Sequence, residues 1–214
     1  MEYECLNPIA MTVEIKHEKF QFLLKWTLLS FGIIPVSYMI SLIVVAMVHG
    51  AFGFNMSEGG TYLSQTVMQI AGGAVIGLGT GIYQRSLLRK VFDVTSSWIY
   101  TLVIGFVVTE LIVCIILWQL GLNRYELRFI EFRSLPETLF FACAGLLIGF
   151  LQMAILRKYF FGSIYWILAN TLGWGICVFV TLISAWAFFI GALLYGALTG
   201  ATLMWILRKK QEDR

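Results

Sequence analysis

The chain has 214 residues, of which 59% are hydrophobic and 13% are charged, and its net charge is +3. A soluble domain carries about 25% charged residues. The composition therefore excludes an ordinary soluble protein and predicts an integral membrane protein. Its positive charge gathers in short segments between apolar runs, as in cytoplasmic loops that face anionic lipid. The expected partner is the lipid bilayer, and nucleic acid is not expected.

Apolar runs follow one another closely from residue 22 to residue 208. A transmembrane helix needs about 20 apolar residues. Residues 1–21 are predicted to form a cytoplasmic segment and residues 209–214 a cytoplasmic tail, with a turn near Ser184–Trp186 dividing the last uncharged run. We predict an all-α integral membrane protein with a single domain of six transmembrane helices, over Phe22–Val48, Tyr62–Gln84, Trp98–Leu120, Glu137–Leu156, Ser163–Ile183 and Phe188–Leu207.

Lys and Arg mark the cytoplasmic side of a membrane protein. With the N-terminus inside, the only basic residues left outside, of the 15 in the chain, are Arg124, Arg128 and Arg133. We therefore expect both termini in the cytoplasm.

An internal repeat underlies these spans. The pattern Gly-x-x-x-Gly-x-x-Gln, followed by Leu-Arg-Lys, occurs at Gly77–Gln84 and again at Gly145–Gln152, an offset of 145 − 77 = 68 residues. Adding the same offset to Trp98 gives Trp166. A shorter third copy is predicted at Gly196-x-x-x-Gly200, with Leu203 in place of the glutamine. We predict three helical-hairpin repeats, each going out on a Trp-headed helix and returning on a Gly-rich helix, with Trp26 heading the first.

Glycines four residues apart lie on one face of a helix and let a neighbouring helix approach closely. A packing seam is the favoured interpretation, and exposed backbone that lines a substrate or ion path is the alternative. The glycines concerned are Gly73, Gly77, Gly81, Gly145, Gly149, Gly196 and Gly200.

Polar, basic and tryptophan side chains recur near the predicted cytoplasmic ends of the helices. We expect the glutamines to hydrogen-bond to another helix. Cations there complement the helix C-terminus and reach the headgroups, and tryptophan favours the membrane interface. The residues predicted to be interfacial are Gln84, Arg89, Gln152, Arg157, Arg208, Trp98 and Trp166.

Glu110 is an acid inside the otherwise uncharged stretch Ser96–Leu122. It lies 12 residues beyond Trp98, or about 18 Å along a helix, and so near the middle of the membrane. Its repeat equivalent is Val178, so the repeat does not require an acid. A neutral acid bonded within the bundle and a cation or proton site both stay open. The candidate polar partners at compatible depths are Gln69, Thr66, Asn170 and Thr171.

Signatures of enzymes are missing from the sequence. The two histidines, His17 and His49, fall on opposite sides of the predicted membrane, so they cannot form one metal site or catalytic triad. We expect no catalytic residues, no metal and no cofactor, and therefore a protein that is not an enzyme.

The repeated motif, with Trp166-Ile167 and Gly173-Trp174 downstream of Gly145–Lys158, resembles uncharacterised multi-pass membrane proteins of bacteria, notably cyanobacteria. This resemblance implies a bacterial inner (plasma) membrane or a thylakoid membrane. It brings no function with it.

Two functions follow as hypotheses. The first is a non-enzymatic structural, sensor or regulatory subunit of a membrane complex, with other membrane protein subunits or a second copy of itself as partner. The alternative is a channel or transporter for a cation, proton or small solute that uses Glu110.

Overall fold

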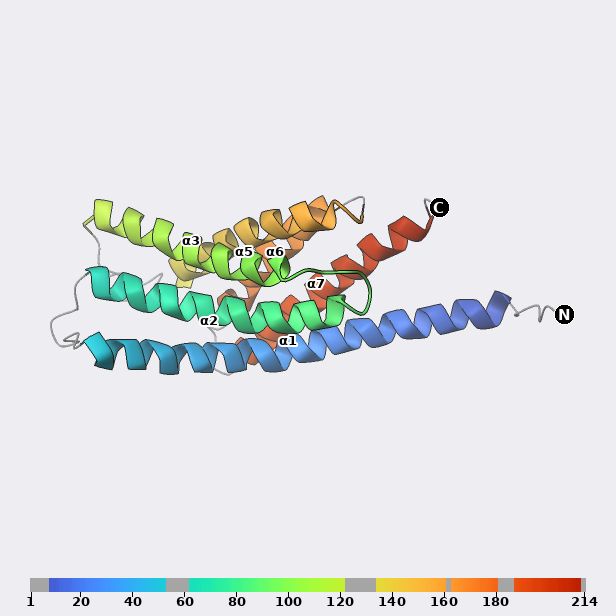
Figure 1. The fold of residues 1–214 in the computed structure, drawn as a ribbon, viewed down its shortest axis with the longest axis horizontal. Coiled ribbons are helices and arrows are strands. Elements are labelled where there is room, and N and C mark those ends of the chain that lie inside the picture. Colours follow the sequence, from blue (N-terminus) through green and yellow to red (C-terminus); the bar gives the residue numbers. More distant parts are fainter. Residues whose placement is uncertain (1–7, 53–61, 122–133, 161–162, 181–186, 213–214) are drawn as a thin grey trace.

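The computed structural model describes residues 8–52, 62–121, 134–160, 163–180 and 187–212. Every regular element among these residues is helical (Figure 1). The helices are α1 (Pro8–Phe52), α2 (Tyr62–Leu88), α3 (Ser97–Gln119), α5 (Ser134–Leu156), α6 (Ile164–Phe179) and α7 (Ala187–Glu212).

Five of these helices are long and apolar enough to cross a membrane. They are α1, α2, α3, α5 and α7, through apolar stretches of 19 to 32 residues. Helices suit this setting because every backbone polar group in lipid must bond within the chain. The predicted all-α class is therefore confirmed, with five helices that are able to span a membrane.

Helix α6 is apolar but shorter, with 16 residues. Its length corresponds to about 24 Å, against a hydrocarbon core of about 30 Å. A sixth span over Ser163–Ile183 stays a prediction. The turn expected near Ser184–Trp186 lies outside the described residues.

Two helices extend beyond the predicted spans. Helix α1 already begins at Pro8, within the segment predicted as a separate cytoplasmic region, and its 45 residues correspond to about 68 Å. Figure 1 shows its N-terminal part, in blue, reaching past the rest of the bundle. Helix α7 continues to Glu212, into the predicted tail. Helical structure thus continues past both predicted membrane boundaries.

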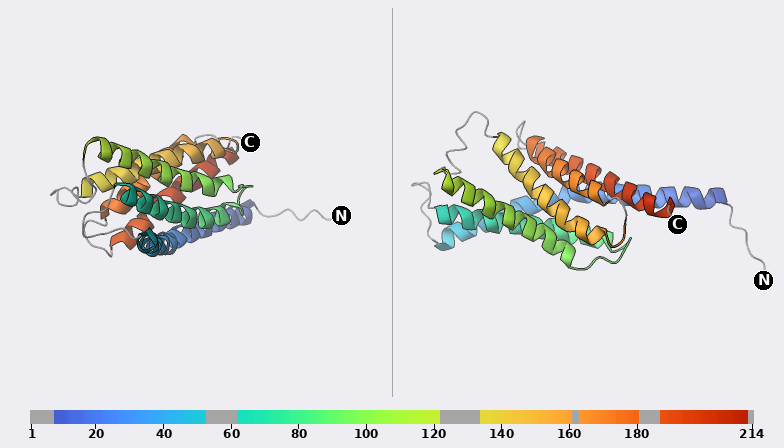
Figure 2. Two further views of the ribbon diagram at one scale, coloured as in Figure 1. Left: turned by 60° about the vertical axis from the view of Figure 1, so that its left-hand side comes forward. Right: turned by 90° about the horizontal axis from the view of Figure 1, so that it is seen from above.

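The helices form a ring. Each packs against the next one along the chain, and α7 packs back on α1 (Figure 2). The ring interior holds the largest fully buried side chains, among them Trp26, Trp98, Trp166, Trp174 and Tyr195. Leu, Ile, Met and Phe side chains cover much of the outside, as a lipid-facing surface requires. We call the end of the bundle where Trp26, Trp98 and Trp166 lie the Trp end.

Close helix approach explains the glycines of α2, α5 and α7, which we call the Gly-rich helices. A Cβ on Gly145 would lie 2.4 Å from the carbonyl oxygen of Asn170 in α6, and one on Gly77 would lie 2.9 Å from that of Leu102 in α3. On α7, a Cβ at Gly196 would lie 3.0 Å from the Cα of Thr27. Neighbours are similarly close at Gly81, Gly149 and Gly200, and the nearest atom at Gly73 is Cβ of Phe106 at 3.3 Å.

Alanine at Gly145 should therefore separate α5 from α6. We expect Gly145→Ala to lower the free energy of unfolding by about 1–3 kcal/mol, the usual range for overpacking. Gly32→Ala is the matched control, because a Cβ there meets nothing within 4 Å and alanine favours a helix by about 0.5–1 kcal/mol. Thermal unfolding in detergent, followed by tryptophan fluorescence, measures both. Equal effects at the two positions would contradict close packing at Gly145.

Candidate functional site

Three buried tryptophans donate their indole N–H to a side chain on a neighbouring helix. Because the indole nitrogen can only donate, each bond also fixes which atom of the partner accepts. The bonds run from Trp98 Nε1 to Gln84 Oε1 (3.0 Å), from Trp166 Nε1 to Gln152 Oε1 (2.8 Å) and from Trp26 Nε1 to Thr199 Oγ1 (3.0 Å). The predicted bonding of Gln84 and Gln152 to another helix is confirmed.

These bonds join α2 with α3, α5 with α6, and α7 with α1, which we call the indole-bonded pairs. Each consists of a Gly-rich helix and the Trp-headed helix that follows it, with α1 following α7 around the ring. The predicted hairpins instead paired each Trp-headed helix with the Gly-rich helix after it. A short turn at residues 89–96 brings the end of α2 next to the start of α3, which places Gln84 beside Trp98.

The third copy of the motif is shifted by one helical turn from the sequence prediction. Thr199 follows Gly196 by three residues, just as Gln84 follows Gly81 and Gln152 follows Gly149. The indole bond from Trp26 puts Thr199 in the place of the glutamine, so the prediction of Leu203 there is wrong. Leu203 instead matches Leu88 and Leu156, which follow the glutamines by four residues and are equally buried.

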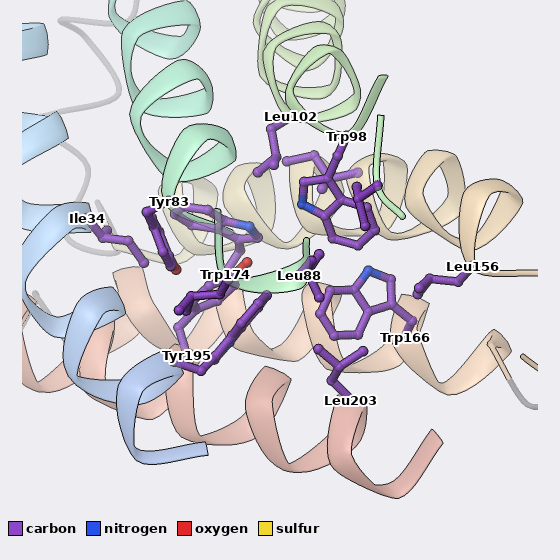
Figure 3. Close-up of a cluster of buried hydrophobic side chains, with 14 of the residues drawn as sticks. Ile34, Tyr83, Leu88, Trp98, Leu102, Leu156, Trp166, Trp174, Tyr195 and Leu203 are labelled. Carbon is purple, nitrogen blue, oxygen red and sulfur yellow. The ribbon is translucent and has the colours of Figure 1, made fainter. Parts of the chain in front are cut away.

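The three indoles lie inside the bundle. Trp98 and Trp166 are 5.9 Å apart between ring centroids, and Trp26 lies 6.3 Å from Trp166. Figure 3 shows Trp98 and Trp166 side by side, with Leu88, Leu156 and Leu203 around them. All three tryptophans have 0% exposure. Their contacts are with each other and with neighbouring helices, and they do not face lipid.

The interfacial role predicted for Trp98 and Trp166 is therefore corrected. An aromatic belt needs lipid-facing rings, and the exposed tryptophans among the described residues are Trp118 and Trp205. Gln84 and Gln152 are also fully buried. Of the predicted cations, Arg89 and Arg157 are exposed just beyond the ends of α2 and α5. Arg208 belongs to α7, and its side chain lies outside the described set.

A polar network extends from one of these bonds across the bundle. Gln84 Nε2 donates to the hydroxyl of Tyr195 (3.0 Å), and that hydroxyl donates to Asn170 Oδ1 (3.3 Å). Asn170 Nδ2 donates to the Trp166 carbonyl (3.0 Å). The network thus links α2, α7 and α6 within the hydrophobic core.

A second link joins α1 to α2. The hydroxyls of Ser30 and Tyr83 lie 2.7 Å apart, and Ser30 also donates to the carbonyl of Trp26. Sequence reasoning missed Ser30, Tyr83, Tyr195 and Thr199. For Ser30 the available signal was spacing, since Ser30 follows Trp26 by four residues as Asn170 follows Trp166.

Glu110 lies apart from this network. It is 4% exposed and faces α2, where a Cβ built on Gly73 would lie 3.5 Å from its Cγ. Of its predicted partners, Gln69 precedes Gly73 by four residues and so lies one turn along the same face of α2. Thr66 is one further turn away. Both are half-buried.

The other two predicted partners are not brought to Glu110. Asn170 is four residues beyond Trp166, whereas Glu110 is 12 beyond Trp98, and the two indoles are neighbours. The difference of eight residues corresponds to about 12 Å along the bundle. Asn170 bonds to Tyr195, and Thr171 Oγ1 donates to the carbonyl of Ile167 in its own helix.

The chemistry of the described residues is that of hydrogen bonds and aromatic packing. Within the described ranges, no group of three His, Cys, Asp or Glu side chains is placed to hold a metal ion. Two polar features remain as candidate sites: the network around the indoles and the buried carboxyl of Glu110.

Removing an indole N–H should leave a buried amide oxygen without its donor. We expect Trp98→Phe to cost about 1–3 kcal/mol of stability, the usual penalty for an unpaired buried polar group. Trp118→Phe is the control, because Trp118 is 62% exposed and should change stability little. Both are measured by thermal unfolding in the same detergent, and a Trp98→Phe cost no larger than that of the control would contradict the role of the bond.

Comparison with protein-family models, with curated proteins and with solved structures gives no match to this chain.

Proposed function

We propose that this chain is a non-enzymatic integral membrane protein that acts as a structural, sensor or regulatory subunit of a membrane complex. The observation that carries this proposal is the filled core at the Trp end. There the ring of Trp166 lies against the rings of Trp26 and Trp98, and the indole N–H groups bond to neighbouring helices. A core of this kind favours a scaffold over a solute pathway.

The outside of the bundle supports a partner within the membrane. In α3, no described residue after Glu110 is buried in the single chain. The exposed apolar side chains on this half of the helix include Leu111, Ile112, Ile115 and Ile116, which lie on one side of it. Such a surface suits lipid and the transmembrane helix of a partner alike. The partner is either another membrane protein or a second copy of this chain.

We also propose that the bundle consists of six transmembrane helices built from three related units. The offset of 68 residues and the three indole bonds support this arrangement. The distribution of Lys and Arg supports cytoplasmic termini. The resemblance to bacterial sequences supports an inner (plasma) or thylakoid membrane.

Crosslinking in the native membrane tests the subunit role. We expect a photoreactive amino acid at Ile115 in α3 to capture a discrete protein band, which mass spectrometry identifies. Leu168 in α6 is the control position, since it is equally exposed (57%, against 55% for Ile115) on another helix. If neither position captures a protein, and the chain purifies alone and monomeric in mild detergent, the subunit role is wrong.

A second candidate function rests on Glu110, a buried carboxyl in the apolar helix α3. An acid within a membrane often marks an ion or proton path. In this role, the protein would be a channel or transporter for a cation, a proton or a small solute. The subunit role remains the better supported, because the polar network at the Trp end lies about 12 Å from this acid along the bundle.

Flux measurements in liposomes test this candidate. If Glu110 carries protons or cations, the reconstituted protein shows proton or potassium flux, and Glu110→Gln reduces it at least tenfold. Thr109→Val is the control, because the hydroxyl of this adjacent buried residue donates to the carbonyl of Gly105 in its own helix. Absence of flux in the parent protein, or equal flux in Glu110→Gln, would rule out a proton or cation path through this acid.

A further inference from the structure

The three indole-bonded pairs can be compared position by position. The residues four before Gln84, Gln152 and Thr199 are Thr80, Ile148 and Tyr195. Each lies one turn further from the Trp end, and Thr80, Ile148 and Tyr195 are all buried. These three positions therefore form one layer of the core.

Side chains in this layer reach from one pair into the next. Ile148 of α5 packs against Gly105 of α3, where a Cβ would lie 2.3 Å from its Cγ1. In the equivalent way, Tyr195 of α7 packs against Gly173 of α6, where a Cβ would lie 2.8 Å from its ring. Gly105 and Gly173 are themselves equivalent, each seven residues beyond its tryptophan. The same contact thus occurs at two of the three positions of the layer.

Tyr195 also reaches the glutamine of the remaining pair. Its hydroxyl accepts from Gln84 Nε2 on α2 at 3.0 Å. When the pairs are superimposed by rotation around the ring, Thr80 of α2 takes the place of Tyr195, and Gln152 of α5 takes the place of Gln84. Threonine is shorter than tyrosine by the whole length of the phenol ring. Its hydroxyl therefore ends well short of the place that the tyrosine hydroxyl would take.

At this third position, two buried polar atoms of the described residues are unpaired. Gln152 Nε2 and Thr80 Oγ1 have no hydrogen-bond partner among the described residues, although both side chains are fully buried. The orientation of the Gln152 amide is fixed, because its oxygen accepts from Trp166 and an indole nitrogen only donates. The amide nitrogen is therefore a donor that requires an acceptor.

We propose that a buried water molecule joins Gln152 Nε2 to Thr80 Oγ1. Its oxygen accepts from the amide and hydrogen-bonds to the threonine hydroxyl. Buried waters of this kind satisfy polar groups that the protein leaves unpaired, and they act as part of the structure. The three pairs thus differ in one layer: tyrosine bonds directly, threonine bonds through water, and isoleucine makes an apolar contact.

The direction in which one substitution shifts the midpoint of thermal unfolding tests this proposal in the full chain. Thr80→Val keeps the shape of the side chain and removes the hydroxyl. If water bridges the two groups, Thr80→Val removes one of its bonds and lowers the midpoint of thermal unfolding by about 2–4 °C. Without a bridge, the variant removes an unpaired buried hydroxyl, and the midpoint stays or rises, which would overturn the proposal. Thr80→Ser, which keeps the hydroxyl, should lose less than Thr80→Val.

A double-mutant cycle separates this bridge from other roles of Thr80. In a Gln152→Leu background the water has lost its donor, so adding Thr80→Val should no longer lower the midpoint. Thr109→Val is the control, and its effect should be the same in both backgrounds. An unchanged Thr80→Val effect in the Gln152→Leu background would contradict the bridge. If Gln152→Leu does not fold, a high-resolution density map decides, through a water peak within hydrogen-bond distance of both atoms.

Discussion

The bond from an indole N–H to a side chain on the neighbouring helix determines how this bundle is assembled. In hydrocarbon a buried N–H finds no water, so it must meet an acceptor or remain unpaired at a cost of several kcal/mol. Trp98, Trp166 and Trp26 meet this requirement across a helix boundary. Each bond therefore sets the relative height of two helices, in addition to holding them together.

The glycines follow from the same requirement. A glutamine side chain reaches the indole of the next helix only if the two backbones are close, and the glycines at 81 and 149 lie one turn before the acceptors. At Gly149 a Cβ would lie 2.8 Å from the Cα of Ile167, a separation that no larger residue tolerates. Lipid offers no hydrophobic driving force between helices, so close contact and polar bonds have to supply the association. Here one sequence motif provides both.

Much of this arrangement could be predicted from the sequence, and the failures have physical reasons. Long apolar runs predict helices because lipid leaves no alternative for the backbone, and the offset between Gln84 and Gln152 is visible in the residues themselves.

The burial of Trp98 was missed because tryptophan near a helix end suits the interface and the interior equally well. The register of the third copy was missed because Gly196 and Gly200 match the glycine spacing at a shift of one turn. In this copy threonine replaces glutamine as the acceptor, so the residue type does not identify Thr199 as the equivalent of the glutamines. The position of Glu110 beside Gly73 depends on how α2 and α3 rotate against each other, which a single sequence does not encode in a readable pattern.

The pairing of α7 with α1 has a consequence for biosynthesis. The donor Trp26 lies in α1 and its acceptor Thr199 in α7, 173 residues later. The pairs α2–α3 and α5–α6 each consist of consecutive helices and can form as soon as the second member is made. Until α7 is present, the indole N–H of Trp26 in α1 lacks its acceptor Thr199. Insertion of α7 therefore closes the ring, and a ribosome that stalls before α7 leaves two complete indole-bonded pairs beside α1, whose indole bond is still missing.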